Sequence, residues 1–218
     1  MGLLSNLYDA IELGHFDWPF RNSHPVHPAI VHYPVAFLSS AYSLDALYGL
    51  TTASKTSSLL SPLARLTPFL PQVAQFAFAS HVIGVISGLP AMTSGTAEFW
   101  ELYKKGGVNR VDKEVVTNPG KSGEEVVDRS ITYGALHGVL NTVAFAVSSY
   151  AIYARYRIPG FVPGRASMVL SGLTLPGVAL SAALGGELVY GKGIGVQRMG
   201  YGLEEKKAGI EEARGKAS

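Results

Sequence analysis

The sequence predicts an all-α fold, a transmembrane four-helix bundle. Three observations support this prediction. Charged residues make up only 16% of the 218-residue chain, against about 25% in typical soluble domains. Most of these charges lie outside four apolar blocks, each long enough to cross a bilayer. Two of the blocks also carry small residues at a spacing of four, which is typical of membrane helices that pack closely.

The predicted membrane domain covers residues 28–196. Its four spans are expected at residues 30–50, 69–93, 130–153 and 166–190. Residues 1–27 are expected to form an interfacial segment, because Met1–Phe20 can form a short amphipathic helix that lies on the membrane surface. A mobile tail is the alternative for that segment. Residues 197–218 form a charged tail.

The first span begins at a group of prolines and histidines between His24 and Pro34. Pro34 has no N–H to donate to the carbonyl of Ile30, so the helix is expected to begin near Tyr33 or to bend there. The stretch Thr51–Thr67, which is rich in Ser and Thr, predicts a connecting loop.

The second and fourth spans carry the small-residue stripes, which predict close helix approach. Their members are Ser80, Gly84 and Gly88, and Gly177, Ser181 and Gly185. Pro90 is expected to fray or kink the end of the second span. The polar stretch Ser94–Arg129 predicts a flexible loop, with a short helix as an option within it.

The third span has one polar face. Its members follow helical spacing and are His137, Asn141, Ala144 and Ser148. This face is expected to point into the bundle, because imidazole and amide groups are costly against lipid.

Four spans would place both termini on the same side of the membrane. Thirteen of the 18 Lys and Arg residues lie on that side, which favours the cytoplasm or the matrix for the termini. Arg155, Arg157 and Arg165 lie in a short loop on the other side and oppose this assignment. The sequence does not indicate which membrane holds the protein.

Several classes of function are excluded. The chain has no cysteine, which removes disulfide frameworks, thiolate zinc sites, iron–sulfur clusters and covalently attached c-type haem. The net charge of +2 gives no basis for nucleic-acid binding. No hydrolase or transferase motif is present, neither a Gly-x-Ser-x-Gly elbow nor a Walker loop. A redox role is the enzymatic option that stays open.

Histidines are the candidate ligands, because neutral imidazole binds both haem iron and metal ions. The cofactor-binding candidates are His32, His137, His27 and His81. The metal-binding candidates are His32, His137 and Glu187. All except His81, which is placed near mid-bilayer, are expected at one depth on the side of the termini.

The alternative is that these histidines are structural, capping helices and bonding to free carbonyls. We prefer this interpretation for His15, His24 and His81. Asp45, near the far end of the first span, is expected to cap the interface or to pair with Lys55 or Arg65.

Three motifs carry a family resemblance. They are His27-Pro28-Ala29-Ile30-Val31-His32-Tyr33-Pro34, the pair His137 and Asn141, and the closing run Gly185-Gly186-Glu187-Leu188-Val189-Tyr190-Gly191-Lys192-Gly193-Ile194-Gly195-Val196. Together they resemble the membrane family catalogued as domain of unknown function 2231, over roughly Pro25 to Val196. The resemblance implies a four-span integral membrane protein. Some relatives are joined to redox modules, which favours haem, but the family has no settled activity to transfer.

Two hypotheses of function follow. The first is a membrane redox protein that binds haem b or a metal ion for electron transfer, with His32 and His137 as ligands and Glu187 or His27 supporting them. Its partners would be the lipid bilayer and a redox protein, and association with a second copy is left open. The second is a structural or partner-binding membrane subunit without a cofactor. A permease is a weaker third option, because four spans lack the repeats of most transporters.

Overall fold

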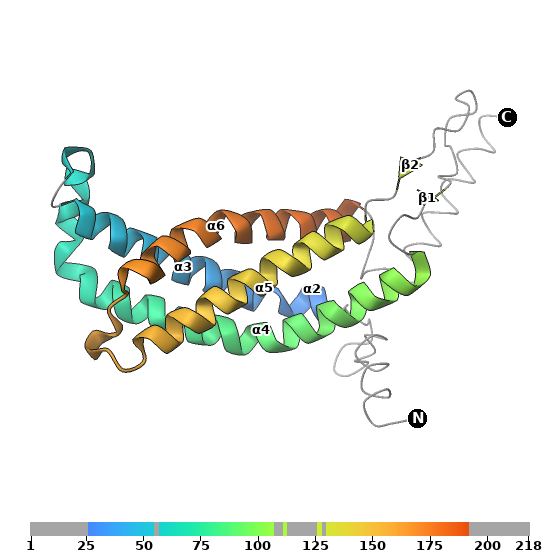
Figure 1. The fold of residues 1–218 in the computed structure, drawn as a ribbon, viewed down its shortest axis with the longest axis horizontal. Coiled ribbons are helices and arrows are strands. Elements are labelled where there is room, and N and C mark those ends of the chain that lie inside the picture. The colour runs from blue at the N-terminus through green and yellow to red at the C-terminus, as the bar shows by residue number, and fades with distance from the viewer. Residues whose placement is uncertain (1–25, 55–56, 107–110, 113–125, 128–129, 192–218) are drawn as a thin grey trace.

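The computed structural model describes residues 26–54, 57–106, 111–112, 126–127 and 130–191. Over these residues the chain forms a bundle of four long helices (Figure 1). They are α3 (His32–Ala53), α4 (Leu70–Gly106), α5 (Ser130–Arg155) and α6 (Arg165–Gly186). The predicted all-α four-helix fold is therefore confirmed. The interfacial helix expected at Met1–Phe20 and the charged tail at 197–218 lie outside the described residues.

Shorter elements flank these helices. They are α2 (Val26–Ile30), the 3-10 helices η1 (Ser58–Phe69) and η2 (Pro159–Phe161), and the π-helical turn η3 (Glu187–Gly191). The two-residue strands β1 (Val111–Asp112) and β2 (Val126–Val127) pair antiparallel, with Val111 opposite Val127.

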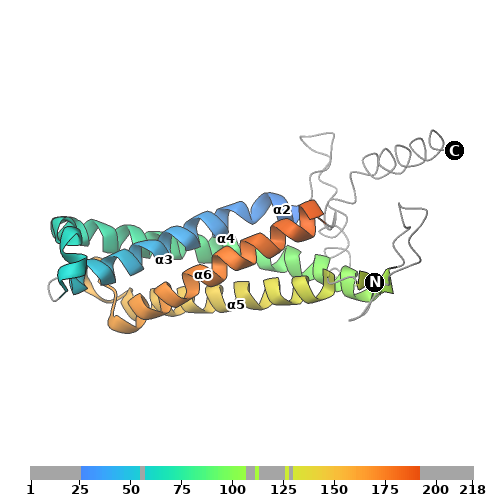
Figure 2. The ribbon, with the colours of Figure 1, turned by 90° about the horizontal axis from the view of Figure 1, so that it is seen from above.

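The four long helices form a ring around the bundle axis. Helices α3 and α5 each pack against both α4 and α6. Figures 1 and 2 show that α2 and the end of α6 lie at one end of the bundle, and that η1 and the α5–α6 connection lie at the other. Polar groups near the start of α3 and the end of α6 are therefore brought to the same end.

The helix boundaries agree with the predicted spans except around prolines. The break between α2 and α3 falls at Val31, where Pro34 was expected to produce it. Helix α4, however, continues through Pro90 to Gly106, so the predictions that the span frays there and that a loop begins at Ser94 are wrong. Proline removes only one backbone donor, the one that would bond to the carbonyl of Ile86, and the rest of the helix continues past it.

The predicted loop at Thr51–Thr67 is also mostly helical. Helix α3 runs on to Ala53, and η1 begins at Ser58 and contains Pro62 and Pro68. The fixed φ of proline lies within the range of a 3-10 helix. The prolines that suggested a loop are therefore compatible with this tighter helix.

Most of the largest fully buried side chains are polar, and many large apolar side chains are exposed on the surface. The largest fully buried side chains are Arg155, Tyr42, His81, Thr51, Asp45, Ser148, Ser167, Ser171 and Ser181. Exposed apolar side chains on α4, α5 and α6 include Phe76, Ile83, Ile86, Leu136, Val139, Val143, Val169, Leu173 and Leu180. This distribution is the reverse of a soluble domain and fits a lipid environment.

Three helical segments among the described residues are long and apolar enough to cross a membrane. They are Leu59–Trp100, Ser130–Arg155 and Arg165–Tyr190. Helix α3, predicted as the first span, is not among them. Its 22 residues include Asp45 and several Ser and Tyr side chains, which lower its apolar character.

Small residues let α3 approach α4 closely. A Cβ atom at Gly84 would lie 2.5 Å from Leu38 Cδ2 and 3.3 Å from the Leu38 backbone nitrogen. A Cβ atom at Gly88 would lie 3.3 Å from Phe145 Cδ2. This stripe of α4 is therefore packed against its neighbours, as the four-residue spacing predicted.

We predict that Gly84→Leu lowers the free energy of unfolding by about 1–3 kcal/mol through overpacking against α3. Gly172→Leu on α6 is the matched control, because a Cβ atom at Gly172 would meet nothing within 4 Å. Unfolding of each purified variant by SDS in mixed micelles, followed by circular dichroism, measures its free energy of unfolding. Equal stability of the two variants would contradict this packing.

Candidate functional site

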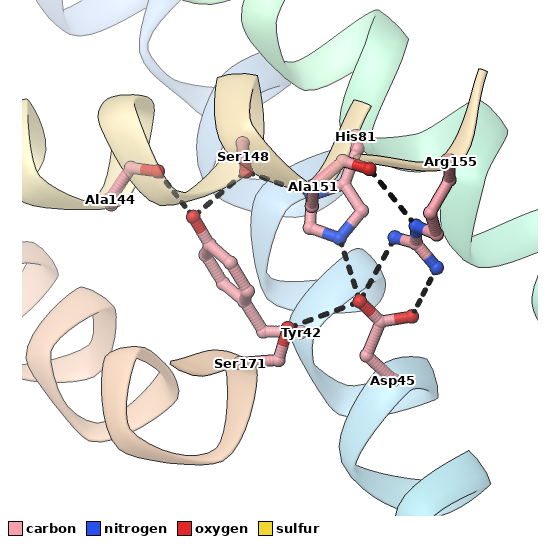
Figure 3. Close-up of polar contacts among 8 residues, drawn as sticks. All are labelled: Tyr42, Asp45, His81, Ala144, Ser148, Ala151, Arg155 and Ser171. Carbon is pink, nitrogen blue, oxygen red and sulfur yellow. Dashed lines mark hydrogen bonds and ion pairs between the residues drawn. The ribbon is translucent and has the colours of Figure 1, made fainter. Parts of the chain in front are cut away.

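Towards the end of the bundle that carries the α5–α6 connection, α3 holds a buried carboxylate that side chains from the other three long helices contact (Figure 3). Asp45 on α3 accepts hydrogen bonds from Arg155 Nη1 at 2.8 Å and Nη2 at 3.0 Å. His81 Nε2 on α4 and Ser171 Oγ on α6 approach Asp45 Oδ2 at 3.0 and 3.1 Å. All four side chains are fully buried. The two charges form a bidentate ion pair, the geometry that best offsets the loss of hydration.

The network continues from His81 along α5. His81 Nδ1 lies 2.8 Å from Ser148 Oγ, which lies 2.8 Å from the Tyr42 hydroxyl. Tyr42 in turn donates to the backbone carbonyl of Ala144. A single chain of hydrogen bonds therefore joins the ion pair to the middle of α5, as Figure 3 shows.

The expectation that Asp45 caps the interface or pairs with Lys55 or Arg65 is wrong. Its partner is Arg155, 110 residues away in the sequence. A carboxylate inside an apolar span has no water to hydrate it, so it pairs with a cation that is buried beside it and not with one in a nearby loop. One sequence signal could have indicated the pair: Arg155 closes the third span, while Asp45 lies near the same end of the first.

A second cluster lies at the opposite end, where two histidines are tethered in the same way. The Nδ1–H group of His27 donates to the carbonyl of Ala91 on α4 at 2.9 Å. The Nδ1–H group of His137 donates to the carbonyl of Ser181 on α6 at 2.8 Å. A serine hydroxyl also lies near each Nδ1, that of Ser94 at 3.1 Å and that of Ser181 at 3.0 Å.

A glycine four residues after each carbonyl makes room for the imidazole. A Cβ atom at Gly95 would lie 2.5 Å from Cε1 of His27, and one at Gly185 would lie 2.9 Å from Cε1 of His137. A Cβ atom tilts toward the N-terminus of its helix, so a side chain at either position would cover the carbonyl one turn earlier. The two glycines therefore expose the carbonyls to which the histidines bind.

The two imidazoles lie beside one another. Their ring centres are 6.4 Å apart, and their planes are nearly perpendicular at 88°. Burial, and secondly the nearby His137, lower the pKa of His27 to about 4, against a smaller opposing effect of the hydrogen bond to Ala91. His27 is thus neutral at pH 7, and with its hydrogen on Nδ1 it keeps a lone pair on Nε2. Nε2 of His137 accepts a hydrogen bond from Asn141 at 3.0 Å.

The other candidate residues have different surroundings. His32 is exposed, and its Nδ1 lies 3.4 Å from the carbonyl of Ala29. Glu187 is exposed at the start of η3. Both nitrogens of His81 bond within the buried network. The histidine that the structure places beside His137 is therefore His27, and no group of three or more His, Cys, Asp or Glu side chains in the described part of the chain could hold a metal ion.

A family model described as "Predicted membrane protein (DUF2231)" matches residues 23–198. The comparison with curated proteins and the comparison with solved structures each gave no match. The matched range contains both polar clusters.

We predict that Arg155→Met lowers the free energy of unfolding by about 3–5 kcal/mol, because it leaves the Asp45 carboxylate buried without its cation. The double variant Asp45→Leu/Arg155→Met should lose much less, since it removes both charges. SDS unfolding of wild type, single variant and double variant measures the difference. A double variant that is as unstable as the single one would contradict a paired charge.

Proposed function

Because the chain belongs to the family of predicted membrane proteins described as DUF2231, we propose that it is a multi-pass membrane protein that binds haem b for electron transfer. In this proposal the imidazoles of His27 and His137 would hold the haem iron. Four spans place both termini on one side, the cytoplasm or the matrix. The observation that carries the proposal is the pairing of these two imidazoles between helices that are far apart in the sequence.

The spacing of the two rings suits a shared metal centre. Two imidazoles that ligate one metal from opposite sides, each at about 2.0–2.1 Å from it, have ring centres about 6 Å apart. The rings of His27 and His137 are 6.4 Å apart. The bundle thus holds the pair near the required distance.

The tethers suit ligation as well. A histidine that binds a metal usually donates its other ring N–H to a carbonyl or carboxylate, which sets the tautomer and the ring orientation. His27 and His137 both donate Nδ1–H to a backbone carbonyl. Each therefore carries its lone pair on Nε2, the atom that a metal requires, and in His137 this lone pair accepts the hydrogen bond of Asn141.

The number of ligands favours haem iron over a bare ion. The described residues offer two imidazoles and no third ligand in a cluster, and haem iron needs only two axial ligands from the protein. When bound, haem b would supply reversible one-electron chemistry. The electron would pass to or from a redox partner protein.

A structural role without a cofactor is the second candidate. The same contacts join α2 to α4 and α5 to α6 with no ligand. In that case each imidazole serves only to satisfy a carbonyl exposed by a glycine. Stability rather than binding would then be the property that these histidines affect.

We predict that the purified protein in detergent shows a Soret band that shifts on reduction, or gains one when titrated with hemin. His27→Ala and His137→Ala should each weaken hemin binding by about tenfold or more, the effect expected from loss of an axial ligand. His32→Ala is the matched control and should bind as wild type, because His32 is exposed at the same end.

A second measurement separates haem iron from a bare metal ion. Metal analysis and titration with copper or zinc should show no binding that depends on both His27 and His137. Binding of the ion but not of hemin would replace haem by a metal site. If neither binds and only the melting temperature falls in the two variants, the structural role is correct.

Asn141 gives an independent prediction. Its amide occupies Nε2 of His137, so it competes with any metal for that lone pair. Asn141→Ala should therefore raise hemin affinity by about threefold or more, because no hydrogen bond has to be broken first. Unchanged or weaker binding, measured by the same titration, would count against His137 as the ligand.

A further inference from the structure

The buried network is one hydrogen short when His81 is neutral. It contains four contacts in series: Tyr42 to the Ala144 carbonyl, Tyr42 to Ser148, Ser148 to His81, and His81 to Asp45. Each contact needs one hydrogen. The two hydroxyl groups supply two, and a neutral imidazole supplies one. An imidazolium supplies two hydrogens and so completes the chain.

We propose that this network is a buried proton-binding site, in which one proton is taken up at Nδ1 of His81. In the protonated form Nδ1–H donates to Ser148, Ser148 donates to Tyr42, and Tyr42 donates to the Ala144 carbonyl. In the neutral form Ser148 donates to Nδ1, and one of the Tyr42 contacts lacks a hydrogen. Uptake therefore reverses the direction of the Ser148 hydrogen bond.

The charged groups around His81 are compatible with both the neutral and the protonated imidazole. Asp45 from α3 and Arg155 from α5 are the charged groups in contact with the network, and Tyr42 is its other titratable group. Helix α6 contributes the neutral Ser171. The network is neutral overall when His81 is neutral and carries one positive charge when His81 is protonated. The completed hydrogen bond thus opposes the cost of burying a charge.

The network lies nearer one end of the bundle than the other. Arg155 is the last residue of α5. Asp45 lies about two turns before the end of α3 at the same end of the bundle. The network is therefore nearer the α5–α6 connection than the end that holds His27 and His137, and the inference does not depend on haem binding there.

The test is NMR of full-length protein with ¹⁵N-labelled histidine in lipid nanodiscs, with the His81 signals assigned from His81→Gln. We expect wild-type His81 to carry hydrogen on both nitrogens at some pH between neutral and about 5. At that pH the imidazolium fraction should be roughly threefold or more lower in Tyr42→Phe, the effect of one hydrogen bond. Tyr42→Phe removes both contacts of the Tyr42 hydroxyl together with its hydrogen. The two contacts that are left have enough hydrogens when His81 is neutral, so protonation completes no further hydrogen bond.

Two further variants keep the test decisive. Ser148→Ala also removes two contacts and one hydrogen, so it should give the same loss, including in the case where Tyr42→Phe does not fold. Ser171→Ala removes one contact together with its own hydrogen, and its imidazolium fraction should not fall. A wild-type His81 that never gains the second hydrogen, or equal fractions in all three variants, would overturn the proposal.

Discussion

The pairing of Asp45 with Arg155 constrains the rest of the bundle. A carboxylate and a guanidinium away from water are tolerated only when their geometry is close to ideal and their remaining donors and acceptors are satisfied. Here the donors come from three different helices, with His81 on α4, Arg155 on α5 and Ser171 on α6. Rotating any one helix about its axis would leave a buried charge incompletely bonded. The ion pair therefore sets the rotation of every helix, which apolar contacts in a lipid environment do only weakly.

Close packing makes these polar contacts geometrically accessible. Asp45 has a short side chain, and it can reach donors on three neighbours only if the backbones are near one another. Gly84 meets Leu38 about two turns from Asp45, and it brings α3 close to α4. The small-residue stripe and the charged network are thus two parts of the same interface. Neither would be stable with large side chains along this face of α4.

Composition and spacing were sufficient to predict the four helices, their approximate bounds and the inward-facing stripes. Three details could not be obtained in this way. Pro90 was expected to fray or kink the end of the second span, but a helix can continue past the loss of one backbone donor when packing supports it. The partner of Asp45 depends on how helices far apart in sequence rotate toward one another. The choice between His27 and His32 depends on the break at Val31, which separates two histidines that share one motif.

One pattern in the sequence is shared by the two histidine contacts. In both cases a small residue supplies the carbonyl and a glycine follows four positions later, Ala91 with Gly95 and Ser181 with Gly185. The carbonyl already bonds within its helix, so only a missing side chain lets an outside imidazole reach its second lone pair. This spacing is ambiguous in sequence alone, because a glycine at i+4 also serves helix packing. It gains meaning only once the partner histidine is located.

One face of α5 connects the two polar clusters. Asn141 donates to His137 toward one end, and Ala144, three residues later, accepts the hydrogen bond of Tyr42. Ser148 and Arg155 continue the same face to the other end. Because the helix is a rigid element, a rotation of α5 that weakened the ion pair would also move His137 away from the Ser181 carbonyl. The geometry of the histidine pair is therefore held, through α5, by the buried charges at the opposite end of the bundle.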